Sequence, residues 1–460
     1  MRIVFNTYFK EGTGGGMGQI VYEMVQVFAE KHQVLFVVPG DKTGIRKAGN
    51  LTYLEIKSVG DDQIILPKLS LKTTKYLGNN LSKFRPDIIH AHDPGIIGFF
   101  LQNWAIKNNA PFVYTSHVLP TKFVEFGSQE AQKKLSEFFD KFIIRKYLKL
   151  FFDNCSGVVA LNAPAKKDIK KLGYSGKIFE ISNGRHLKNY NQLPFADISS
   201  LIKKLLFIGY FSFRKNQQFL LKVMTRLPKN FQLDLIGVPL QEKYKEELIS
   251  FAKKYKLNVN FLGRIDHRQI PEFLQKAHFF VSSSKMEVQS LVVMEAMASG
   301  TPVVGLSNET MDQFVNEKNG FNFPKRTSPK IFADKILKLS NLSQKDYKKL
   351  CVNARKKMET YDWVKIREQT EKMYQAIIGE KKNDREVKKR NLANFFDELI
   401  LRLDKGKGKA PKDIIKGFNT RDLYVLLLST AIFVVVSWYS FNKKFKRIWL
   451  KFNLSSWFIK

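Results

Sequence analysis

Two glutamates in one short stretch have the residue type and spacing to take part in chemistry. The stretch KMEVQSLVVMEAMASGTPVV, residues 285–304, holds Glu287 and Glu295 with seven residues between them. The preceding run HFFVSSS is typical of a buried strand, and a helix is expected from about Ser290. Glu287 would then lie on the loop after the strand, at the sheet edge where open α/β sheets bind ligands.

The beginning of that helix would suit a phosphate. Ser290, Leu291 and Val292 would present free backbone N–H groups, and Glu295 would lie one turn further, within reach of a sugar hydroxyl. A nucleotide sugar fits this arrangement, with one carboxylate for the donor sugar and one for the ribose. Taken alone, the spacing favours a plainer explanation, a capping glutamate at the helix start and a surface glutamate.

Composition limits the class of protein. The chain has 460 residues, enough for two or three domains, and its 77 Lys and Arg against 42 Asp and Glu give a net charge of +35. This excess favours a polyanionic partner, whether nucleic acid, an anionic membrane or a phosphorylated small molecule. Cys155 and Cys351 lack metal-ligand spacing and fit a reducing compartment. The N-terminus does not have the layout of a signal peptide.

Apolar runs typical of buried parallel strands alternate with amphipathic helical stretches such as residues 19–31 and 94–108. This alternation predicts an α/β fold of two doubly wound, Rossmann-like domains facing a cleft. The expected domains are residues 1–186 and 200–360, and a helix at 361–380 is expected to cross back to the first. The strand candidates are MRIVFNTYF, HQVLFVVPG, PDIIHAHDP, PFVYTSH, CSGVVALN, KIFEISNG, KKLLFIGY, FQLDLIGVP, VNFLGR, AHFFVSSS and TPVVGLS.

The C-terminal residues differ in composition. Residues 381–422 are predicted to form a basic linker, and residues 442–460 a basic amphipathic tail. Between them, residues 423–441 carry no charge, and a helix of this length spans roughly 29 Å, close to the ~30 Å of a bilayer core. We therefore expect a membrane helix. A buried core helix is the alternative. Similar numbers of basic residues on both sides of the membrane helix leave two arrangements open, a bitopic helix and a cytoplasm-facing, monotopic insertion.

EVQSLVVMEAMASGTPVV resembles the E-x7-E signature of the retaining glycosyltransferases of family 4, which have the GT-B fold. A glutamine after the first glutamate is similar to the diacylglycerol glucosyltransferase branch. The resemblance extends from residue 1 to about residue 380 and includes GGGMGQIVYEM, RPDIIHAHDP, TSH, ISNG, GYFSFRKN and YDWVKI.

This resemblance implies a role for several residues. The glycine loop, with Gly15 and Gly16, would lie against the donor phosphates and the acceptor. His117 would contact the donor sugar, and Lys215 would neutralise the diphosphate as it gains charge on leaving. Glu287 would position the sugar, because retention in this family needs no obligatory protein nucleophile.

One position departs from the family pattern. The family usually has arginine after the glycine of GR, whereas here Tyr210 follows Gly209. Arg214 is the candidate to supply the missing guanidinium. The departure puts the diphosphate site partly in doubt and leaves altered donor choice or low activity open.

Other polar residues are interpreted as structural. His90, His92 and Asp93 follow or end a strand, and Asn183 and Gly184 resemble the turn before the second domain. The sequence shows no DxD motif and no paired histidines at ligand spacing. The resemblance likewise implies no metal ion or other cofactor, since lysine and a helix N-terminus take that role.

The acceptor is inferred from charge and amphipathicity. Residues 133–152 combine an apolar stripe with cations and are expected either to pack on their own domain or to dock on a membrane. Most of the positive charge lies in residues 1–380, which suits an anionic lipid surface. The cations of this stretch are Lys133, Lys134, Lys141, Arg145, Lys146 and Lys149.

The leading interpretation is transfer of a hexose, glucose first, from a nucleoside-diphosphate sugar to 1,2-diacylglycerol at the cytoplasmic side of the cell membrane. Phosphatidylinositol and a polyprenyl-linked glycan are alternative acceptors. A non-enzymatic membrane scaffold on a decayed GT-B fold is an alternative of another class, motivated by Tyr210. Nucleic acid is not an expected partner, because the chain lacks any recognisable nucleic-acid-binding module.

Overall fold

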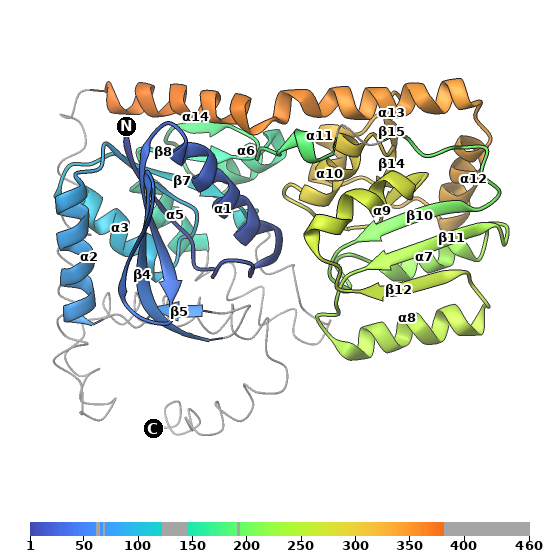
Figure 1. Ribbon diagram of the computed structural model, residues 1–460, viewed down its shortest axis with the longest axis horizontal. Helices are drawn as coiled ribbons and strands as arrows, with labels where there is room; N and C mark the ends of the chain where they lie inside the picture. Colours follow the sequence, from blue (N-terminus) through green and yellow to red (C-terminus); the bar gives the residue numbers. More distant parts are fainter. Residues whose placement is uncertain (61–64, 68–69, 122–144, 191–193, 381–460) are drawn as a thin grey trace. The chain divides into compact units, whose positions relative to one another are not determined.

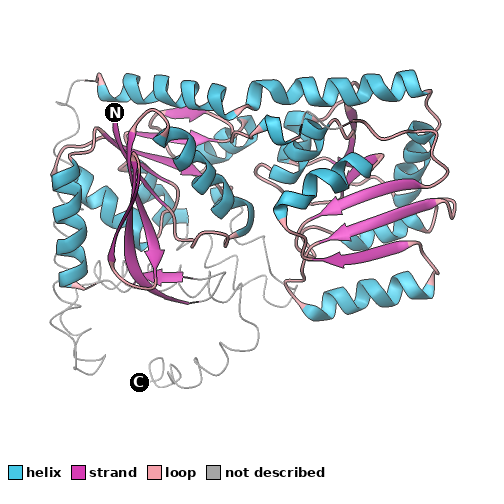
Figure 2. Ribbon diagram, in the orientation of Figure 1, coloured by secondary structure: helices cyan, strands magenta, loops and turns pink. Residues whose placement is uncertain are grey.

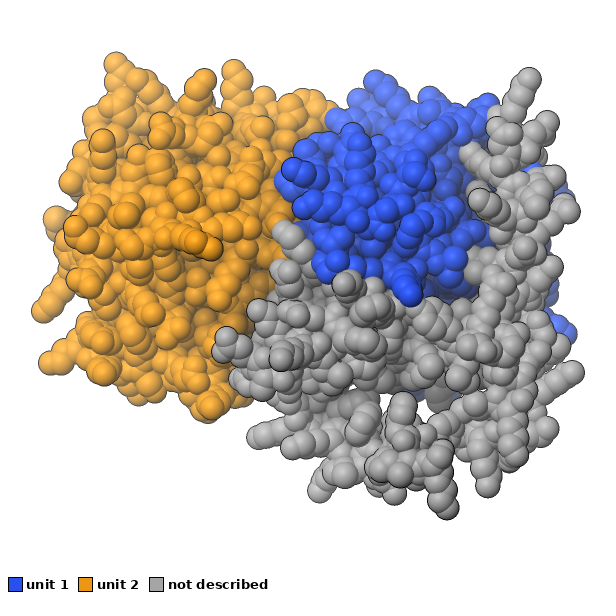
Figure 3. Space-filling view, turned by 180° about the vertical axis from the view of Figure 1, so that it is seen from behind, with its two compact units in different colours: residues 1–181, 367–460 blue, residues 182–366 orange. Residues whose placement is uncertain are grey.

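The protein divides into two compact units, coloured separately in Figure 3. Unit 1 consists of Met1–Ile181 and the chain from Arg367 onward, and unit 2 consists of Ser182–Ile366. The computed structural model describes residues 1–60, 65–67, 70–121, 145–190 and 194–380.

Several predicted segments lie outside the described residues. These are the basic linker, the membrane helix at 423–441 and the tail, together with residues 133–144 of the amphipathic stretch. Among the residues that are described, no helix is long and apolar enough to span a bilayer.

A largely parallel sheet forms the centre of unit 1. Its strand order is β3-β4-β2-β1-β6-β7-β8-β9, with β5 beside β4, and the neighbours are parallel except at β3–β4 and β4–β5. The chain order switches direction between β1 and β6, so ligands are expected at the carboxyl ends of these strands. The strands are β1 Arg2–Asn6, β2 Gln33–Gly40, β3 Gly44–Ala48, β4 Leu51–Gly60, β5 Ile65–Pro67, β6 Ile88–Ala91, β7 Phe112–Ser116, β8 Gly157–Ala160 and β9 Ile178–Glu180.

The helices of unit 1 include the later part of α14, Trp363–Ile378 (Figure 1). The buried guanidinium of Arg367 donates to the carbonyl of Val27 at 2.8 Å and pairs with Glu30 at 2.7 Å, at the end of α1. A cation is favourable there because a helix C-terminus carries partial negative charge. The other helices are α1 Gly15–Ala29, α2 Leu71–Phe84, α3 Ile96–Lys107, α5 Arg145–Asp153 and α6 Ala163–Lys171.

The position of helix α5 decides between packing and membrane docking for part of the amphipathic stretch. Its apolar stripe is buried within unit 1, and the Phe151 ring lies edge-on to Phe112 and Tyr114. Arg145 donates to a backbone carbonyl, and Lys149 pairs with Asp153 at 2.6 Å. Over residues 145–152, therefore, the amphipathic pattern reflects packing on the helix's own domain, the alternative to membrane insertion.

Unit 2 has a second parallel sheet, with the order β12-β11-β10-β13-β14-β15 and a switch of direction between β10 and β13. Its strands are β10 Lys203–Ile208, β11 Phe231–Ile236, β12 Val259–Gly263, β13 Phe279–Ser282, β14 Val303–Leu306 and β15 Gly320–Phe323. The helices are α7 Gln217–Met224, α8 Glu242–Lys254, α9 Ile270–Lys276, α10 Leu291–Ser299, α11 Glu309–Phe314, α12 Pro329–Ser340 and α13 Gln344–Met358, with short 3-10 helices at Leu187–Asn189, His267–Gln269 and Glu359–Tyr361.

Alternation along the strands builds the core of unit 2. Every second strand residue, such as Leu205 and Phe207 in β10 or Leu233 and Leu235 in β11, joins one buried cluster with the apolar faces of α7, α8 and α12. Helix α7 contacts α8 and α12, whereas α10 contacts α9 and α13, so helices cover the sheet on both faces (Figure 2). Both units are doubly wound α/β structures, as predicted.

The sequence analysis did not identify β3, β4, β5 or β15. Strand β3 has the polar sequence GIRKA and an exposed burial pattern, so it lacks the apolar run that marks a buried strand. It pairs with β4 through a tight hairpin in which Ala48 lies opposite Leu51 and Gly49 has a φ of 58°. Such edge hairpins are specified by turn chemistry more than by hydrophobicity.

The glycine loop connects β1 to α1 and contains positions that only glycine suits. Gly12 and Gly14 both have a φ of 76°, a region that costs other residues about 1–2 kcal/mol. A Cβ on Gly14 would lie 2.1 Å from the Phe9 ring, whereas a Cβ on Gly12 would meet no heavy atom within 4 Å. Gly14 is therefore constrained both by its backbone and by the neighbouring ring.

We expect Gly14→Ala to lower the free energy of unfolding more than Gly12→Ala does. Both variants strain the same φ, but only Gly14→Ala displaces the Phe9 ring, and such overpacking costs typically about 1–3 kcal/mol more. Urea unfolding of the two variants and the parent protein measures the difference. Equal losses in the two variants would contradict the packing explanation.

Candidate active site

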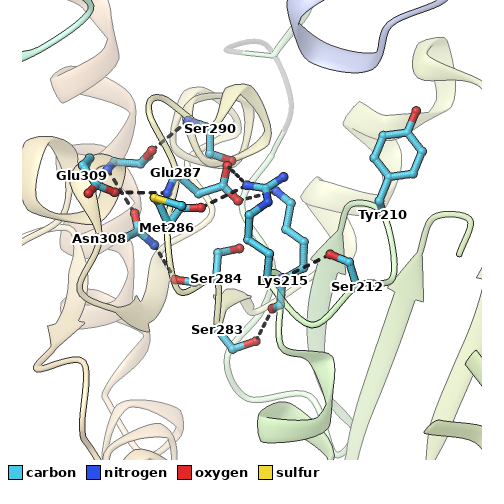
Figure 4. A network of polar contacts seen from close by, with 12 residues as sticks. Tyr210, Ser212, Lys215, Ser283, Ser284, Met286, Glu287, Ser290, Asn308 and Glu309 are labelled. Carbon is cyan, nitrogen blue, oxygen red and sulfur yellow. Dashed lines mark hydrogen bonds and ion pairs between the residues drawn. The ribbon is translucent and has the colours of Figure 1, made fainter. Parts of the chain in front are cut away.

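Three charged side chains meet in unit 2 at the ends of β10 and β13, the strands on either side of the switch point. Lys215 Nζ lies 2.5 Å from Glu287 Oε1, and Arg214 Nη1 lies 3.2 Å from Glu287 Oε2. Arg214 also donates to the carbonyl of Met286 at 3.0 Å. Figure 4 shows the Lys215 side chain directed at the Glu287 carboxylate. The prediction that Glu287 lies on the loop after the strand is confirmed.

Hydrogen bonds between the two loops hold this cluster together. Ser283 Oγ donates to the carbonyls of Lys215 and Asn216, each at 2.9 Å, and the backbone N–H of Lys285 donates to the Arg214 carbonyl. Asn216 has a φ of 57°, which turns the chain into α7. The loop carrying the cations is thus fixed to the loop carrying the carboxylate.

A second set of contacts comes from the beginning of α11. Asn308 Nδ2 donates to the Ser284 carbonyl at 2.9 Å, and the backbone N–H of Glu287 donates to Glu309 at 3.2 Å (Figure 4). Asn308 also accepts hydrogen bonds from the first N–H groups of α11 and so caps this helix. The position of Glu287 is therefore set by backbone as well as by charge.

The electrostatics of this cluster keep Glu287 ionised. Burial raises the pKa of the Glu287 carboxyl, but the charges of Lys215 and Arg214 and the hydrogen bonds of the carboxylate outweigh it and lower the pKa to about 2. Burial lowers the pKa of the Lys215 ammonium, and the attraction of Glu287 opposes that change. Two cations against one anion leave a net positive charge, which is suited to a phosphate group.

Helix α10 begins where it was predicted, but one of its three expected N–H groups is engaged. Ser290 is the N-cap residue, and its backbone N–H donates to Thr310 Oγ1 at 2.8 Å. The expectation of a free N–H at Ser290 was therefore wrong. Leu291 and Val292 form the first turn of the helix, where backbone N–H groups have no acceptor within the helix.

Glu295 is not a surface residue. It is 1% exposed, and its Oε1 atom lies 3.2 Å from Arg185 Nη2 and 3.2 Å from His267 Nε2. Arg185 is likewise 1% exposed, whereas the His267 side chain is about half exposed. The other oxygen of Glu295, Oε2, has no hydrogen-bond partner in the described part of the chain. Glu287 and Glu295 therefore lie in different charge environments despite their common motif.

The positions of Tyr210 and Arg214 account in part for the missing arginine after Gly209. The Arg214 guanidinium points towards Glu287, so a guanidinium is present beside Lys215. Tyr210 points away from this cluster, and its backbone carbonyl accepts a hydrogen bond from Gln217 at 2.8 Å (Figure 4). Gln289, after the first glutamate, accepts from the backbone N–H of Asn183 and donates to Ser182.

In unit 1, polar residues gather at the carboxyl ends of β1, β6 and β7. His117 follows β7, is partly exposed, and its Nε2 atom lies 2.9 Å from Nδ1 of the buried His92. His90 contacts Tyr374 and Thr115 through its two ring nitrogens, as expected for a structural residue.

Asp93 follows β6 and is 1% exposed. Burial raises the pKa of the Asp93 carboxyl to about 7, against backbone hydrogen bonds from Gly95 and Gly98. It also hydrogen-bonds to Asn6 at the end of β1. Gly15 and Gly16 form the first turn of α1, so a helix N-terminus begins close to β1 in the sequence.

Sequence reasoning missed several residues that shape these sites: Arg185, His267, Glu309, Thr310 and Asn6. Asn308, three residues before an apolar position, is a recognisable helix cap and would have indicated the loop that supports Glu287. Nothing in the sequence indicates that Arg185 pairs with Glu295, because 109 intervening positions separate them. Within the described ranges, no group of three or more His, Cys, Asp or Glu residues could hold a metal ion.

The comparison with known families agrees with the two α/β units and with the motifs found in both halves of the chain. Residues 14–189 match the family described as Glycosyltransferase Family 4, and residues 198–357 match Glycosyl transferases group 1. The two matches together cover most of the chain. The protein belongs to the family 4 glycosyltransferases of the GT-B fold.

Relatives of known name are distant. The chain is 26% identical over 305 residues to the sulfoquinovosyl transferase of Arabidopsis thaliana, covering 64% of this chain but only 58% of that protein. It is 23% identical over 331 residues to the alpha-monoglucosyldiacylglycerol synthase of Acholeplasma laidlawii, covering 62% of this chain and 79% of the synthase. The chain thus spans less than two thirds of the length of the first of these relatives.

Solved structures show the same fold. Sucrose-phosphate synthase from Thermosynechococcus elongatus superposes with a TM-score of 0.66 at 18% identity, covering 82% of this chain and 99% of that one. The Anabaena HepE protein in complex with UDP and glucose has a TM-score of 0.62 at 18% identity, covering 82% of this chain and 100% of that one. At this identity the likeness concerns the fold alone.

We expect Glu295→Gln to destabilise the protein, because it would leave the buried Arg185 charge without its carboxylate. Removing one partner of a buried ion pair costs about 3–5 kcal/mol, whereas replacing both by apolar residues is often tolerated. The double variant Arg185→Met with Glu295→Met should therefore be more stable than Glu295→Gln. Chemical unfolding of these variants measures the coupling.

His267→Ala is the matched control for this pair, since it removes the exposed partner of the same carboxylate. Its effect on the free energy of unfolding should stay below about 1 kcal/mol, as for other partly exposed pairs. A Glu295→Gln variant as stable as the parent protein would show that Arg185 does not depend on this pair.

The lowered pKa of Glu287 predicts a specific pH dependence of stability. The carboxyl has an ordinary pKa of 4.5 and a folded-state pKa of about 2. Its stabilising contribution is therefore complete above about pH 5 and is lost as the pH falls towards about 2. The stability of the parent protein should fall over this range more steeply than that of Glu287→Gln. Parallel curves from acid titrations of the two proteins would contradict the assigned pairing.

Proposed function

We propose that the protein transfers glucose from a nucleoside-diphosphate sugar to 1,2-diacylglycerol, with retention at the anomeric carbon. The observation that carries this proposal is the cluster of Lys215, Arg214 and Glu287 beside the first turn of α10. A diphosphate needs positive charge and N–H donors, and both are present at the switch point of the unit 2 sheet.

Each residue has a chemical task in this proposal. Lys215 and Arg214 stabilise the negative charge that the nucleoside diphosphate gains as its bond to the sugar breaks. The backbone N–H groups of Leu291 and Val292 complement them. Glu287 holds both cations in place and accepts a hydrogen bond from a donor-sugar hydroxyl. With this positive charge supplied by the protein, the proposal includes no metal ion or other cofactor.

Other residues bind the rest of the donor in this proposal. Glu295 Oε2 accepts a hydrogen bond from the ribose, which would satisfy the oxygen left without a partner in the described chain. His117 contacts the donor sugar. Gly15 and Gly16 let the backbone approach the phosphates and the acceptor, because they have no side chain and open a helix.

The choice of a lipid acceptor rests on charge and on the relatives. A net charge of +35 favours an anionic membrane surface. Relatives bear the names alpha-monoglucosyldiacylglycerol synthase, sulfoquinovosyl transferase and, in Mycobacterium leprae, phosphatidyl-myo-inositol mannosyltransferase. The last name keeps phosphatidylinositol as the second candidate acceptor. We further propose attachment to the cytoplasmic face of the cell membrane through residues 423–441.

A panel assay tests this function directly. Full-length protein in detergent is incubated with labelled UDP-glucose, UDP-galactose or GDP-mannose and with vesicles of diacylglycerol, phosphatidylinositol or a polyprenyl phosphate sugar. We expect glucosyl-diacylglycerol as the main product, with the α-configuration of the donor kept. Transfer to another lipid instead would show that diacylglycerol is not the acceptor. Absence of transfer to every acceptor would favour the scaffold alternative.

Lys215→Ala should lower the transfer rate by about a hundredfold, the loss typical of one charge-stabilising group in an enclosed site, or about 3 kcal/mol. Lys222→Ala is the matched control, because Lys222 is an exposed lysine on the adjoining helix α7. Initial rates with each variant, alongside thermal unfolding, give the comparison. Near-normal turnover of Lys215→Ala would show that the diphosphate does not bind at this site.

A further inference from the structure

Three histidine rings in unit 1 lie in a row. The ring centroids of His90 and His92 are 4.4 Å apart, and those of His92 and His117 are 5.2 Å apart. His90 and His92 are buried, whereas His117 at the end of β7 is partly exposed. A contact of 2.9 Å joins Nδ1 of His92 to Nε2 of His117. Two nitrogens at this distance share one proton, so one ring donates and the other accepts.

The inner rings of this row are held firmly. The backbone N–H of His92 donates to Asn6 Oδ1 at 3.1 Å, and its ring packs against Phe5 at 5.8 Å between centroids. Both nitrogens of His90 are engaged, one by the Tyr374 hydroxyl at 2.5 Å and one by Thr115 at 2.6 Å. The His92 ring therefore has a fixed orientation from which to act on His117.

Both partners of the contact are neutral near pH 7. Burial lowers the pKa of His92 well below its ordinary value, and the neighbouring His90 and His117 lower it further. Burial likewise lowers the pKa of His117 to about 4. Each ring consequently carries one proton, and two arrangements remain. Either His92 donates from Nδ1 to His117, or His117 donates from Nε2 to His92.

The far nitrogen of His92 distinguishes these two arrangements. His92 Nε2 is buried and has no hydrogen-bond partner in the described part of the chain. If His117 were the donor, His92 would carry its proton on Nε2, as a buried N–H without an acceptor. Buried N–H groups without partners are rarer in proteins than under-satisfied acceptors. The geometry therefore favours a proton on His92 Nδ1 and a lone pair on Nε2.

We infer that His92 is a positioning residue that donates a hydrogen bond from Nδ1 to His117 Nε2 and so fixes His117 as the tautomer protonated on Nδ1. His117 then presents an N–H donor to a ligand, and its lone pair is occupied. This excludes His117 as a general base in the resting protein. If the proposed function holds, on which this one consequence rests, His117 donates to an oxygen of the donor sugar.

Nitrogen NMR tests the tautomer without any assay of activity. The full-length protein is prepared in detergent with ¹⁵N-labelled histidine rings, and the His117 signals are assigned among the seven histidines by their loss in His117→Ala. We expect a protonated Nδ1 and an unprotonated Nε2 for His117. A His117 ring protonated on Nε2 in the parent protein would overturn the inference.

Two nearly isosteric variants separate positioning from packing. In His92→Asn the side-chain amide nitrogen replaces the Nδ1 donor, whereas in His92→Gln the amide lies closer to the place of Nε2. His92→Asn should keep the His117 tautomer, and His92→Gln should change it or mix the two forms. If both variants unfold at the same temperature but keep the same tautomer spectrum, His92 does not set the tautomer.

The rates of sugar transfer by the same two variants test whether His92 affects the reaction. We expect His92→Gln to lower kcat by at least about tenfold, the loss of about one hydrogen bond, with little change in the affinity for nucleoside diphosphate. His92→Asn should restore most of the rate. A correct tautomer in a protein that transfers no sugar would refute the proposed function while leaving the positioning role intact. If the parent protein does transfer sugar, equal rates in the two variants would overturn that role.

Discussion

The charged cluster of Lys215, Arg214 and Glu287 in unit 2 depends on one carboxylate, that of Glu287. Without Glu287, the ammonium of Lys215 and the guanidinium of Arg214 would lose the carboxylate that both contact, and the loss of a buried counter-charge is costly. With it, both cations are stabilised and a net positive charge remains. Hydrogen bonds that Ser283 and Asn308 donate, and one that Glu309 accepts, fix the loops that carry these three groups.

The two glutamates of the motif have different physical roles because they lie on different kinds of backbone. Glu287 lies on a loop at a sheet edge, where cations from a neighbouring loop can reach it. Glu295 lies within α10 and is buried against Arg185, so its charge also balances a buried guanidinium of unit 2. A carboxylate held in this way is already oriented before a ligand binds. Because replacing Glu295 also affects the fold, a loss of ligand binding in such a variant does not by itself report a contact with the ligand.

In one place, unit 1 buries polar side chains without an ion pair. Its row of histidines has no neighbouring carboxylate in hydrogen-bonding contact among the described residues, and burial keeps the rings neutral. Neutral rings can donate and accept hydrogen bonds without the desolvation cost of an ion. The chain thus combines a charged cluster in unit 2, suited to phosphate, with a neutral polar row in unit 1, suited to hydroxyl groups.

The sequence determined the parts of the fold that depend on local pattern. Apolar runs of strand length predicted β1, β2 and β6 to β14, and the loop and helix around Glu287 and Ser290 followed from the same pattern. Strand β3 was missed because a solvent-facing strand needs no apolar run, and β5 was missed because its three residues are too few to form a recognisable run. Family resemblance, rather than periodicity, supplied the roles of Lys215 and His117.

Only the tertiary structure decided how the polar residues pair. Arg185 and Glu295 are far apart in the chain, as are Thr310 and the N–H of Ser290, and no local pattern encodes either contact. The same holds for α5, whose amphipathic sequence fits a membrane surface or a protein core equally well until its neighbours Phe112 and Tyr114 are in place. Periodicity fixes which face of an element is apolar, but long-range packing decides what that face and its charges meet.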